Sequence, residues 1–298
     1  MEKCTAFVFG GGGSRGALQV GAMQALLEAG MVPDLLVGTS VGAVNAAGLA
    51  LWGVDLDGLA ALERAWGKVS DLQVLDPRVS GLVLRALLGH PSDRTRKKVE
   101  DFFVSMGFTH DLRFDQIARV RLALISADLE TGQLVVYGRD RRESILEGLL
   151  ASIALPPWFA PLHKGGQLIV DGGALSNLPI ELALRLGATE IVAFDLDDAA
   201  LMPKENRTFS QYFEKYLYAL SRRHVCLEMA LAEAQGVSVY VIEFRGLAQD
   251  PIWDFTHYCA LIRAGYEKAN QAMAEWNWSR ATQLESILSR PGTEKLPG

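Results

Sequence analysis

Cysteine is scarce in this 298-residue chain, and the three that occur, Cys4, Cys226 and Cys259, lie far apart. An odd number of widely spaced cysteines without a C-x-x-C pair offers neither a disulfide framework nor the ligand spacing of a zinc site. We therefore expect reduced thiols packed in the core, as is usual for a cytoplasmic protein.

Long apolar runs and a surplus of positive charge are also missing. No run reaches the about 18 apolar residues of a membrane-spanning helix. The first residues lack the charged leader, apolar stretch and cleavage site of a signal peptide. The formal net charge of -6 argues against a surface that neutralises nucleic-acid phosphates, so we expect no nucleic-acid partner. Net charge does not decide contact with a lipid surface, for which a local patch is enough.

The composition is that of a folded globular protein. Hydrophobic residues make up 49% of the chain and charged residues 21%, which supplies a core and gives no sign of disorder. The length lies within the range of a single large α/β domain. We predict one domain over residues 1–298, with its core at about 5–198.

Two strand-turn-helix units follow one another at the start of the chain. The apolar run 5–9 leads through glycines into helical spacing at 17–29, and the run 35–37 leads through a tight turn into an alanine-rich helix at 43–51. Successive units of this kind place their strands side by side in a parallel sheet. The sequence therefore predicts an α/β fold with a mainly parallel central sheet.

The rest of the chain continues this pattern after an interruption. The stretch 57–110 is mostly helical in pattern, and we interpret it as a helical insertion. The polar stretch 197–208 is the best candidate linker, yet a late strand and helices at about 209–290 are expected to pack on the same core. Strands are predicted at 121–126, 133–137, 168–170, 190–195 and 237–244, and helices at 180–186 and 259–273.

The segment Gly38-Thr39-Ser40-Val41-Gly42 has the pattern G-x-S-x-G. A serine on a sharp strand-to-helix turn needs small neighbours, because its backbone is strained and closely packed. The predicted strand before the motif and the helix after it provide that context. Ser40 is therefore a candidate nucleophile. The alternative is an ordinary turn in which Ser40 caps the helix.

The run 10–16 consists of four glycines followed by Ser-Arg-Gly. Residues without Cβ let several backbone N–H groups converge on one anion, which suits a phosphate or an oxyanion. Three of these glycines also match G-x-G-x-x-G, the dinucleotide-binding pattern, which needs an acidic residue at the end of the second strand. The acidic residue available, Asp34, precedes that strand and Ser40 follows it. An oxyanion hole facing a nucleophile fits better.

Asp171 leaves an apolar strand and enters a turn with Gly172 and Gly173. On its own, such a residue is more often a turn-forming aspartate whose side chain binds the local backbone. A carboxylate with no bulky neighbours at a strand end is also a candidate base.

In this order, the glycine loop, the serine turn and the Asp-Gly-Gly turn resemble the patatin-like phospholipase family. The family pattern is G-G-G-x-[RK]-G, G-x-S-x-G and D-G-[GA], and residues 11–16, 38–42 and 171–173 match it without a departure. Further similarity lies at 127–132, 151–161 and 177–179. The resemblance spans about residues 5–198.

The resemblance implies a three-layer α/β/α fold and a serine acyl hydrolase that cleaves lipid carboxylic esters through a Ser-Asp dyad and an acyl-enzyme. It implies neither a metal nor another cofactor. The implied partner is a lipid ester or phospholipid, and peripheral contact with a membrane is left open. By this resemblance Ser40 is the nucleophile, Asp171 is the base, and Gly11, Gly12 and Gly13, with Arg15, form the oxyanion hole.

Histidine could complete a hidden triad, because His224 and His257 follow Asp171 in the chain order of α/β-hydrolases. Both histidines lie in helix-like segments, and Ser40 comes very early in the chain. We therefore expect structural or solvent-facing roles for them, and the same for His163.

Three further groups leave alternatives open. Asp195, Asp197 and Asp198 cluster at a strand end, where a divalent cation could bind, although a solvated loop is the interpretation we favour. The basic run 94–98 either contacts lipid head groups or is an ordinary solvated surface. Trp158 and Phe159 are candidate substrate-binding residues on an apolar wall, with core packing as an equal alternative.

Two other classes of function remain in view. One is a lipid-binding or regulatory protein that keeps the fold but turns over little substrate, against which intact Ser40 and Asp171 count. The other is a dinucleotide-binding protein. The head group, the acyl length, the ester position and the oligomeric state are left open by the sequence.

Overall fold

An eight-stranded sheet forms the centre of the protein, in the order β5-β6-β3-β2-β1-β7-β8, with β4 paired to β3. The computed structural model describes residues 3–72, 93–202, 208–247 and 251–276. The strands are β1 (Thr5–Phe9), β2 (Leu35–Thr39), β3 (Arg121–Asp128), β4 (Gln133–Tyr137), β5 (Leu162–Lys164), β6 (Gln167–Asp171), β7 (Glu190–Asp195) and β8 (Ser238–Glu243).

Five of these strands, β3, β2, β1, β7 and β8, are parallel to their neighbours in that series. Of the other three, β4 and β6 pair antiparallel with β3, and β5 pairs antiparallel with β6. The prediction of a mainly parallel sheet is confirmed. β5 was not predicted, because a strand of three residues is too short to show a periodic pattern.

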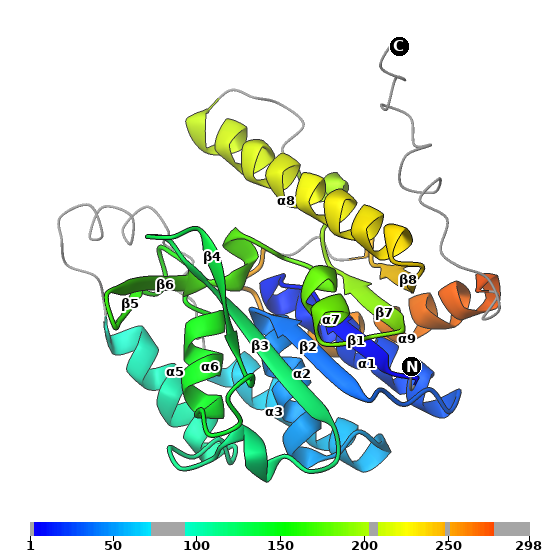
Figure 1. Cartoon of the computed structure of the whole chain (residues 1–298), viewed down its shortest axis with the longest axis horizontal. Coiled ribbons are helices and arrows are strands. Elements are labelled where there is room, and N and C mark those ends of the chain that lie inside the picture. The colour runs from blue at the N-terminus through cyan, green and yellow to red at the C-terminus, as the bar shows by residue number, and fades with distance from the viewer. Residues whose placement is uncertain (1–2, 73–92, 203–207, 248–250, 277–298) are drawn as a thin grey trace.

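Helices cover both faces of the sheet (Figure 1). On β1, Phe7 and Phe9 point into the larger core, whereas Ala6 and Val8 point into the smaller one. Strands buried on both faces make the three-layer α/β/α fold that was predicted. The helices are α1 (Gly16–Glu28), α2 (Val41–Trp52), α3 (Leu56–Leu72), α5 (Asp93–Ser105), α6 (Ile145–Ser152) and α9 (Tyr258–Glu275) on the larger core, and α7 (Ile180–Arg185) and α8 (Phe209–Ala234) on the smaller.

The late helix α9 packs closely against the first helix, α1. A Cβ on Gly265 of α9 would lie 2.0 Å from the carbonyl oxygen of Leu18, and one on Gly21 of α1 would lie 1.7 Å from that of Ile262. Only residues without a side chain allow two backbones to approach so closely. Of the stretch 209–290, residues 248–250 and 277–290 lie outside the described part of the chain.

The helical insertion is described in two pieces, α3 and α5, which lie on the same face as α2. Residues 73–92 between them, for which helix was also predicted, lie outside the described residues. The three cysteines are free, but Cys4 and Cys226 are only half-buried and Cys259 is exposed. Cys4 packs against the smaller core, but the prediction of core packing is wrong for Cys226 and Cys259, because the outer helices α8 and α9 bury only one face each.

The sheet brings the sequence motifs to one edge. Parallel pairing puts the carboxyl ends of β1, β2 and β7 side by side, so the glycine loop, Ser40 and Asp195 leave the sheet together. Asp171 is the last residue of the antiparallel strand β6 and pairs with Ser126 on β3. The residue before Ser126 on β3 pairs with Thr39, so Asp171 also lies next to the end of β2. Ligands of open α/β sheets bind at this edge.

Candidate active site

Ser40 lies on the sharp turn between β2 and α2, with φ of 55° and ψ of -127°. Among the described residues it is the only non-glycine with positive φ. Such a conformation costs ~1–3 kcal/mol and persists only where its surroundings enforce it. A Cβ on Gly42 would lie 2.2 Å from the carbonyl oxygen of Phe9, and one on Gly38 would lie 2.5 Å from that of Gly42. The two glycines of the motif therefore permit the turn.

A buried hydroxyl group holds this turn in place. The Ser40 N–H donates to Oγ of Ser152 at 2.9 Å, and Ser152, the last residue of α6, is fully buried. The Thr39 hydroxyl donates to the carbonyl of Ser176 at 3.1 Å. No role was predicted for Ser152 or Ser176. The only signal for Ser152 is its place in the stretch 151–161 that resembles the family.

Asp171 is buried, with 3% of its surface exposed. Its Oδ1 accepts a hydrogen bond from the Gly173 N–H at 2.8 Å, while Oδ2 has no partner among the described residues. Burial raises the pKa of Asp171 from 3.8 to about 6, and the nearby Ser40 hydroxyl and the Gly173 amide offset part of that rise. A buried carboxyl group with one free oxygen beside a serine can accept a proton.

The glycine loop packs directly against Ser40. A Cβ on Gly11 would lie 3.1 Å from Cβ of Ser40 and 2.5 Å from Oδ1 of Asn177. The Gly11 N–H donates to the carbonyl of Asn177 at 3.0 Å, whereas the Gly12 and Gly13 amides have no acceptor among the described residues. Two amides of the predicted oxyanion hole are therefore free in this conformation, and the third is occupied.

The Arg15 side chain holds the glycine loop in its conformation through hydrogen bonds. Its guanidinium group donates to the carbonyls of Gly12 at 3.1 Å and Leu196 at 2.9 Å. Both of these contacts are to backbone oxygens, so the side chain shapes the loop that carries the free amides. Asn177, which was noted only as part of a similar stretch, adds a second brace by donating to the carbonyl of Gly11 at 3.3 Å.

An apolar cavity of about 130 Å³ opens beside Ser40. That volume is about ten times the space that one water molecule needs. Apart from Ser40 and Gly13, every described residue that lines it is apolar: Val41, Val44, Trp52, Leu62, Ala65, Trp66, Val69, Val99, Phe102, Phe103, Met106, Phe108, Ile153, Leu155, Trp158, Phe159, Ile252 and Phe255. The helices α3 and α5 of the insertion supply much of this wall.

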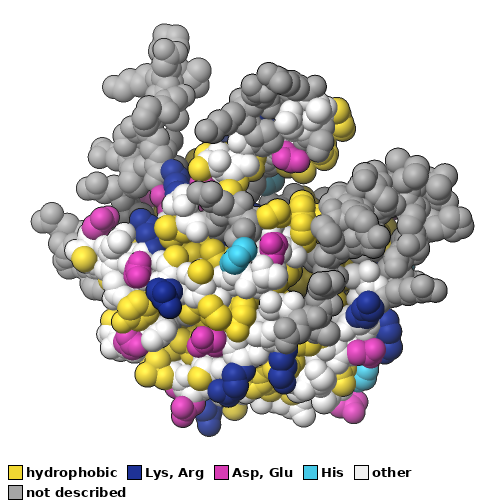
Figure 2. Space-filling view, turned by 180° about the vertical axis from the view of Figure 1, so that it is seen from behind, with side chains coloured by type: hydrophobic (Ala, Val, Ile, Leu, Met, Phe, Trp, Pro, Cys, Tyr) yellow, Lys and Arg dark blue, Asp and Glu magenta, His cyan; other side chains and the backbone are white. Residues whose placement is uncertain are grey.

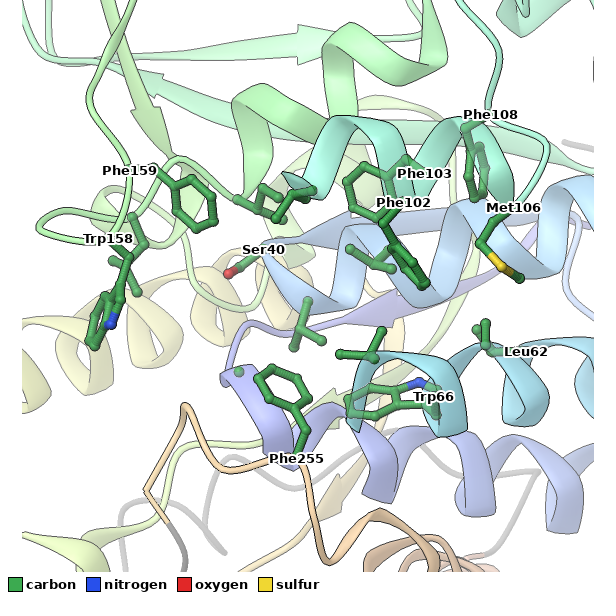
Figure 3. Close-up of a pocket in the computed structure, with 18 of the residues that line it drawn as sticks. Ser40, Leu62, Trp66, Phe102, Phe103, Met106, Phe108, Trp158, Phe159 and Phe255 are labelled. Carbon is green, nitrogen blue, oxygen red and sulfur yellow. The ribbon is translucent and has the colours of Figure 1, made fainter. Parts of the chain in front are cut away.

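Figure 3 shows how the cavity is arranged around the serine. Trp158 and Phe159 stand on one side of Ser40, and α5 extends away on the other side toward Met106 and Phe108. The two predicted substrate-binding residues therefore line the same cavity as the serine.

The other polar candidates are not among the described residues that line the cavity beside Ser40. His163 and His257 are exposed, His224 is half-buried on α8, and no histidine among the described residues lines the cavity. The carboxylates of the acidic cluster bind protein groups: Asp195 pairs with Arg222, and Asp197 accepts from Asn177. Asp198 accepts backbone N–H groups from Ala200 and Gly246. In the described chain no group of three or more His, Cys, Asp or Glu side chains could hold a metal ion.

The remaining sequence candidates have local roles. Asp34 accepts a hydrogen bond from the Thr5 N–H at 2.8 Å, at the edge of the sheet opposite Ser40. In the basic run, Arg96 donates to the Ala160 carbonyl and Lys97 pairs with Asp101 at 2.9 Å. None of the described helices is both long enough and apolar enough to cross a membrane.

Comparison with curated proteins finds relatives of this chain. An uncharacterized NTE family protein of Mycobacterium tuberculosis is 34% identical over 190 residues, which cover 63% of this chain and 30% of that protein. Patatin-like phospholipase domain-containing protein 6 of Homo sapiens is 30% identical over 201 residues, which cover 64% of this chain and 13% of that protein. The chain thus spans less than a third of the length of these relatives.

Solved structures with a related arrangement are more distant in sequence. VipD from Legionella pneumophila is 14% identical with a TM-score of 0.47, over 92% of this chain and 67% of that one. Human GIVD cytosolic phospholipase A2 is 14% identical with a TM-score of 0.48, over 91% of this chain and 59% of that one. The family model described as patatin-like phospholipase matches residues 7–184, more than half of the chain, from β1 into α7 and including all three motifs. The chain therefore belongs to the patatin-like phospholipase family.

Proposed function

We propose that this protein hydrolyses carboxylic esters of lipids, with Ser40 as the nucleophile and Asp171 as the base. The position of Ser40 carries the proposal, because its side chain stands on a strained turn and lines an otherwise apolar cavity. An acyl chain in that cavity brings its ester carbonyl to Oγ of Ser40. Membership of the patatin-like phospholipase family supports the same class of reaction.

Asp171 moves the proton. A carboxylate of ordinary pKa is a weak base toward a serine hydroxyl, and burial narrows the difference by raising the pKa of Asp171 to about 6. Asp171 takes the Ser40 proton as Oγ attacks the carbonyl carbon, and then gives it to the departing alcohol. Water next attacks the acyl-enzyme, with Asp171 again accepting a proton, and the fatty acid leaves as Ser40 is restored.

The free amides of Gly12 and Gly13 are placed to stabilise the oxyanion. They belong to the loop that contacts Ser40 and are not used by the fold. Removing one oxyanion donor typically costs ~10²- to 10³-fold in rate. Of the four residues predicted to form the oxyanion hole, Gly11 and Arg15 therefore shape the loop. The hydrogen-bond donors to the oxyanion are the amides of Gly12 and Gly13.

We expect the cavity to select substrates by their acyl chain and not by their head group. Among the described residues its wall consists of aliphatic and aromatic side chains, with no charged group to bind a phosphate. Hydrocarbon is transferred favourably into such surroundings, at ~0.8 kcal/mol for each buried CH₂. Phospholipids, lysophospholipids and acylglycerols all offer such a chain, with the head group remaining outside the cavity.

Covalent labelling with a long-chain fluorophosphonate tests the proposal, together with hydrolysis of a panel of acyl esters. We expect labelling and hydrolysis by the wild type and neither by Ser40→Ala, whereas Asp171→Asn loses hydrolysis. His224→Ala and His257→Ala should hydrolyse as the wild type does. Labelling that persists in Ser40→Ala would falsify the assignment. A wild type that binds fatty acid but forms no acyl-enzyme with any ester would instead be the low-turnover lipid-binding protein.

A further inference from the structure

The long helix α8 carries an apolar face that the rest of the described structure leaves uncovered. Eleven large apolar side chains are exposed in the described residues, and eight of them lie on this helix. The exposed fraction reaches 78% at Phe209 and 59% at Tyr212. The set, called here the outer stripe, is Phe209, Tyr212, Phe213, Tyr216, Leu217, Leu220, Leu227 and Leu231.

The stripe follows one side of the helix. At 3.6 residues per turn its members fall within an arc of about 140°. Neighbouring rings stack, with centroids 5.6 Å apart for Phe209 and Phe213 and 6.2 Å apart for Phe213 and Tyr216. Val225 and Met229 lie on the opposite side of the helix, in the smaller core. The helix therefore has two apolar faces, and only one of them is packed.

Polar contacts on the inner side fix which way the stripe faces. Arg222 pairs with the buried Asp195, at the end of β7, at 2.5 Å. Glu228 accepts from the buried Ser176 hydroxyl at 2.5 Å, in the turn after Asp171. These contacts tie α8 to the sheet edge that carries the site, so rotation of the stripe toward the core would break them.

The first half of α8 projects beyond this attachment. The twelve residues 209–220 precede Ser221, which is bound to Asp197 at 2.6 Å. They extend the helix by roughly 18 Å at 1.5 Å per residue. Figure 1 shows this half standing clear of the sheet, and Figure 2 shows hydrophobic side chains gathered at its end. Because Asp195 and Ser40 lie at the same edge of the sheet, the projecting half leaves the protein on the side of the site.

The exposed apolar area of the outer stripe reaches the size of the largest apolar patch on a typical monomer. The four aromatic residues alone expose about 460 Å², taking about 200 Å² for each whole side chain and the fractions 78%, 59%, 43% and 49%. The four leucines add to this. The largest apolar patch of a typical monomer is ~300–600 Å² and usually marks a binding surface.

We propose that the outer stripe docks onto the surface of a phospholipid bilayer, a proposal that rests on the lipid substrate class proposed above. No acidic residue lies within the arc of the stripe, and Arg223, exposed within that arc midway along the helix, complements lipid phosphate groups. Tyrosine and phenylalanine are suited to the layer between water and hydrocarbon, where the hydroxyls of Tyr212 and Tyr216 stay hydrated. In a dry pairing of two α8 helices these hydroxyls and Arg223 would need partners.

Sedimentation of the 298-residue chain with vesicles tests this proposal, using phosphatidylcholine alone and with phosphatidylglycerol. All variants carry Ser40→Ala, so that binding is measured without turnover. The test variant is Phe209→Gln with Phe213→Gln. Its matched control is Val32→Gln with Leu56→Gln, which are 58% and 52% exposed and lie beside the start of β2 and the end of α2, at the other edge of the sheet.

We expect the test variant to bind vesicles on the order of tenfold more weakly than its parent, and the control to bind equally well. With Ser40 restored, hydrolysis of vesicle lipid should fall in parallel, while hydrolysis of a soluble short-chain ester stays the same. Equal binding by the test variant and its parent overturns the proposal. The proposal is also overturned if light scattering shows that the parent protein is a dimer and the test variant a monomer, while both bind vesicles equally well. Failure of the proposed function shows separately, as a wild type that does not hydrolyse the soluble ester.

Discussion

Replacing Asp171 with Asn should change the stability of the protein in a way that depends on pH. The folded protein raises the pKa of Asp171 to about 6 from an ordinary value of 3.8, because the buried carboxylate is poorly solvated. The difference corresponds to roughly 3 kcal/mol in the free energy of unfolding. The carboxyl group stabilises the fold fully below pH 3.8, and this contribution is lost as the pH rises through about 6. The side-chain amide of the Asp171→Asn variant does not titrate, so the free energy of unfolding of the variant does not fall for this reason as the pH rises.

Urea unfolding of both proteins measures the effect. Between about pH 4.5 and about pH 8, the free energy of unfolding of Asp171→Asn should gain about 2 kcal/mol on that of the wild type, since part of the effect lies below this range. Other buried carboxyl groups with raised pKa values, Asp195 and Glu228, are present in both proteins, so their contributions cancel in the difference. The buried side-chain amide that replaces the Asp171 carboxyl group can change the free energy of unfolding by an amount that is independent of pH. Such a change shifts the whole curve and leaves its dependence on pH unaltered.

Ser40→Ala is the matched control for this measurement. It also lacks the proposed activity but keeps Asp171, so its stability should still fall as the pH rises, at least as far as that of the wild type, because the Ser40 hydroxyl no longer offsets part of the rise in the pKa of Asp171. A difference between Asp171→Asn and the wild type that stays constant across the pH range would show that Asp171 titrates near its ordinary pKa, and the reasoning from its burial would be refuted.

Three further predictions concern the site. First, kcat/KM for a soluble ester should rise with pH and level off above about 6, following one ionisation of Asp171; a profile that is flat down to about pH 4 contradicts this. Second, Ser152→Ala removes the acceptor of the Ser40 N–H and should lower the free energy of unfolding by about 1 kcal/mol, with a fall of roughly tenfold or more in kcat if the turn relaxes; an unchanged kcat would show that Ser152 does not position the nucleophile. Third, Met106→Trp fills the cavity at a distance from Ser40 and should reduce kcat/KM on the order of tenfold for long acyl chains, at ~1–3 kcal/mol, and not for butyryl esters. Met106→Leu is the control, and an equal loss for both chain lengths would argue against acyl binding there.

The layers of the fold were predictable because they follow from local periodicity. Buried parallel strands read as short apolar runs, each followed by glycine and a helical pattern. The family and the three-layer α/β/α class are confirmed. β5 and its antiparallel pairing escaped prediction, since pairing between strands is a property of distant residues and leaves little mark on three positions.

Prediction of the site was limited in the same way. Gly11 has the right residue type for a free amide, yet its missing Cβ serves close packing against Ser40, and its N–H is bound to Asn177. A glycine pattern does not distinguish these two uses. The bond from the Ser40 N–H to Ser152 joins residues 112 positions apart, and the apolar residues of α3 and α5 that line the cavity have the same spacing as residues that fill a core.

The antiparallel placement of β6 also bears on when the protein becomes competent during folding. The nucleophile turn and the glycine loop lie within the first 42 residues of the chain, but the carboxylate reaches Ser40 only after β6 has paired with β3, on the same edge as β2 and just past its end. Contacts between residues so far apart in sequence form slowly, because a long loop must close first. Recovery of ester hydrolysis during refolding should therefore lag behind recovery of helical circular dichroism, which makes turnover a reporter of the pairing of β6 with β3.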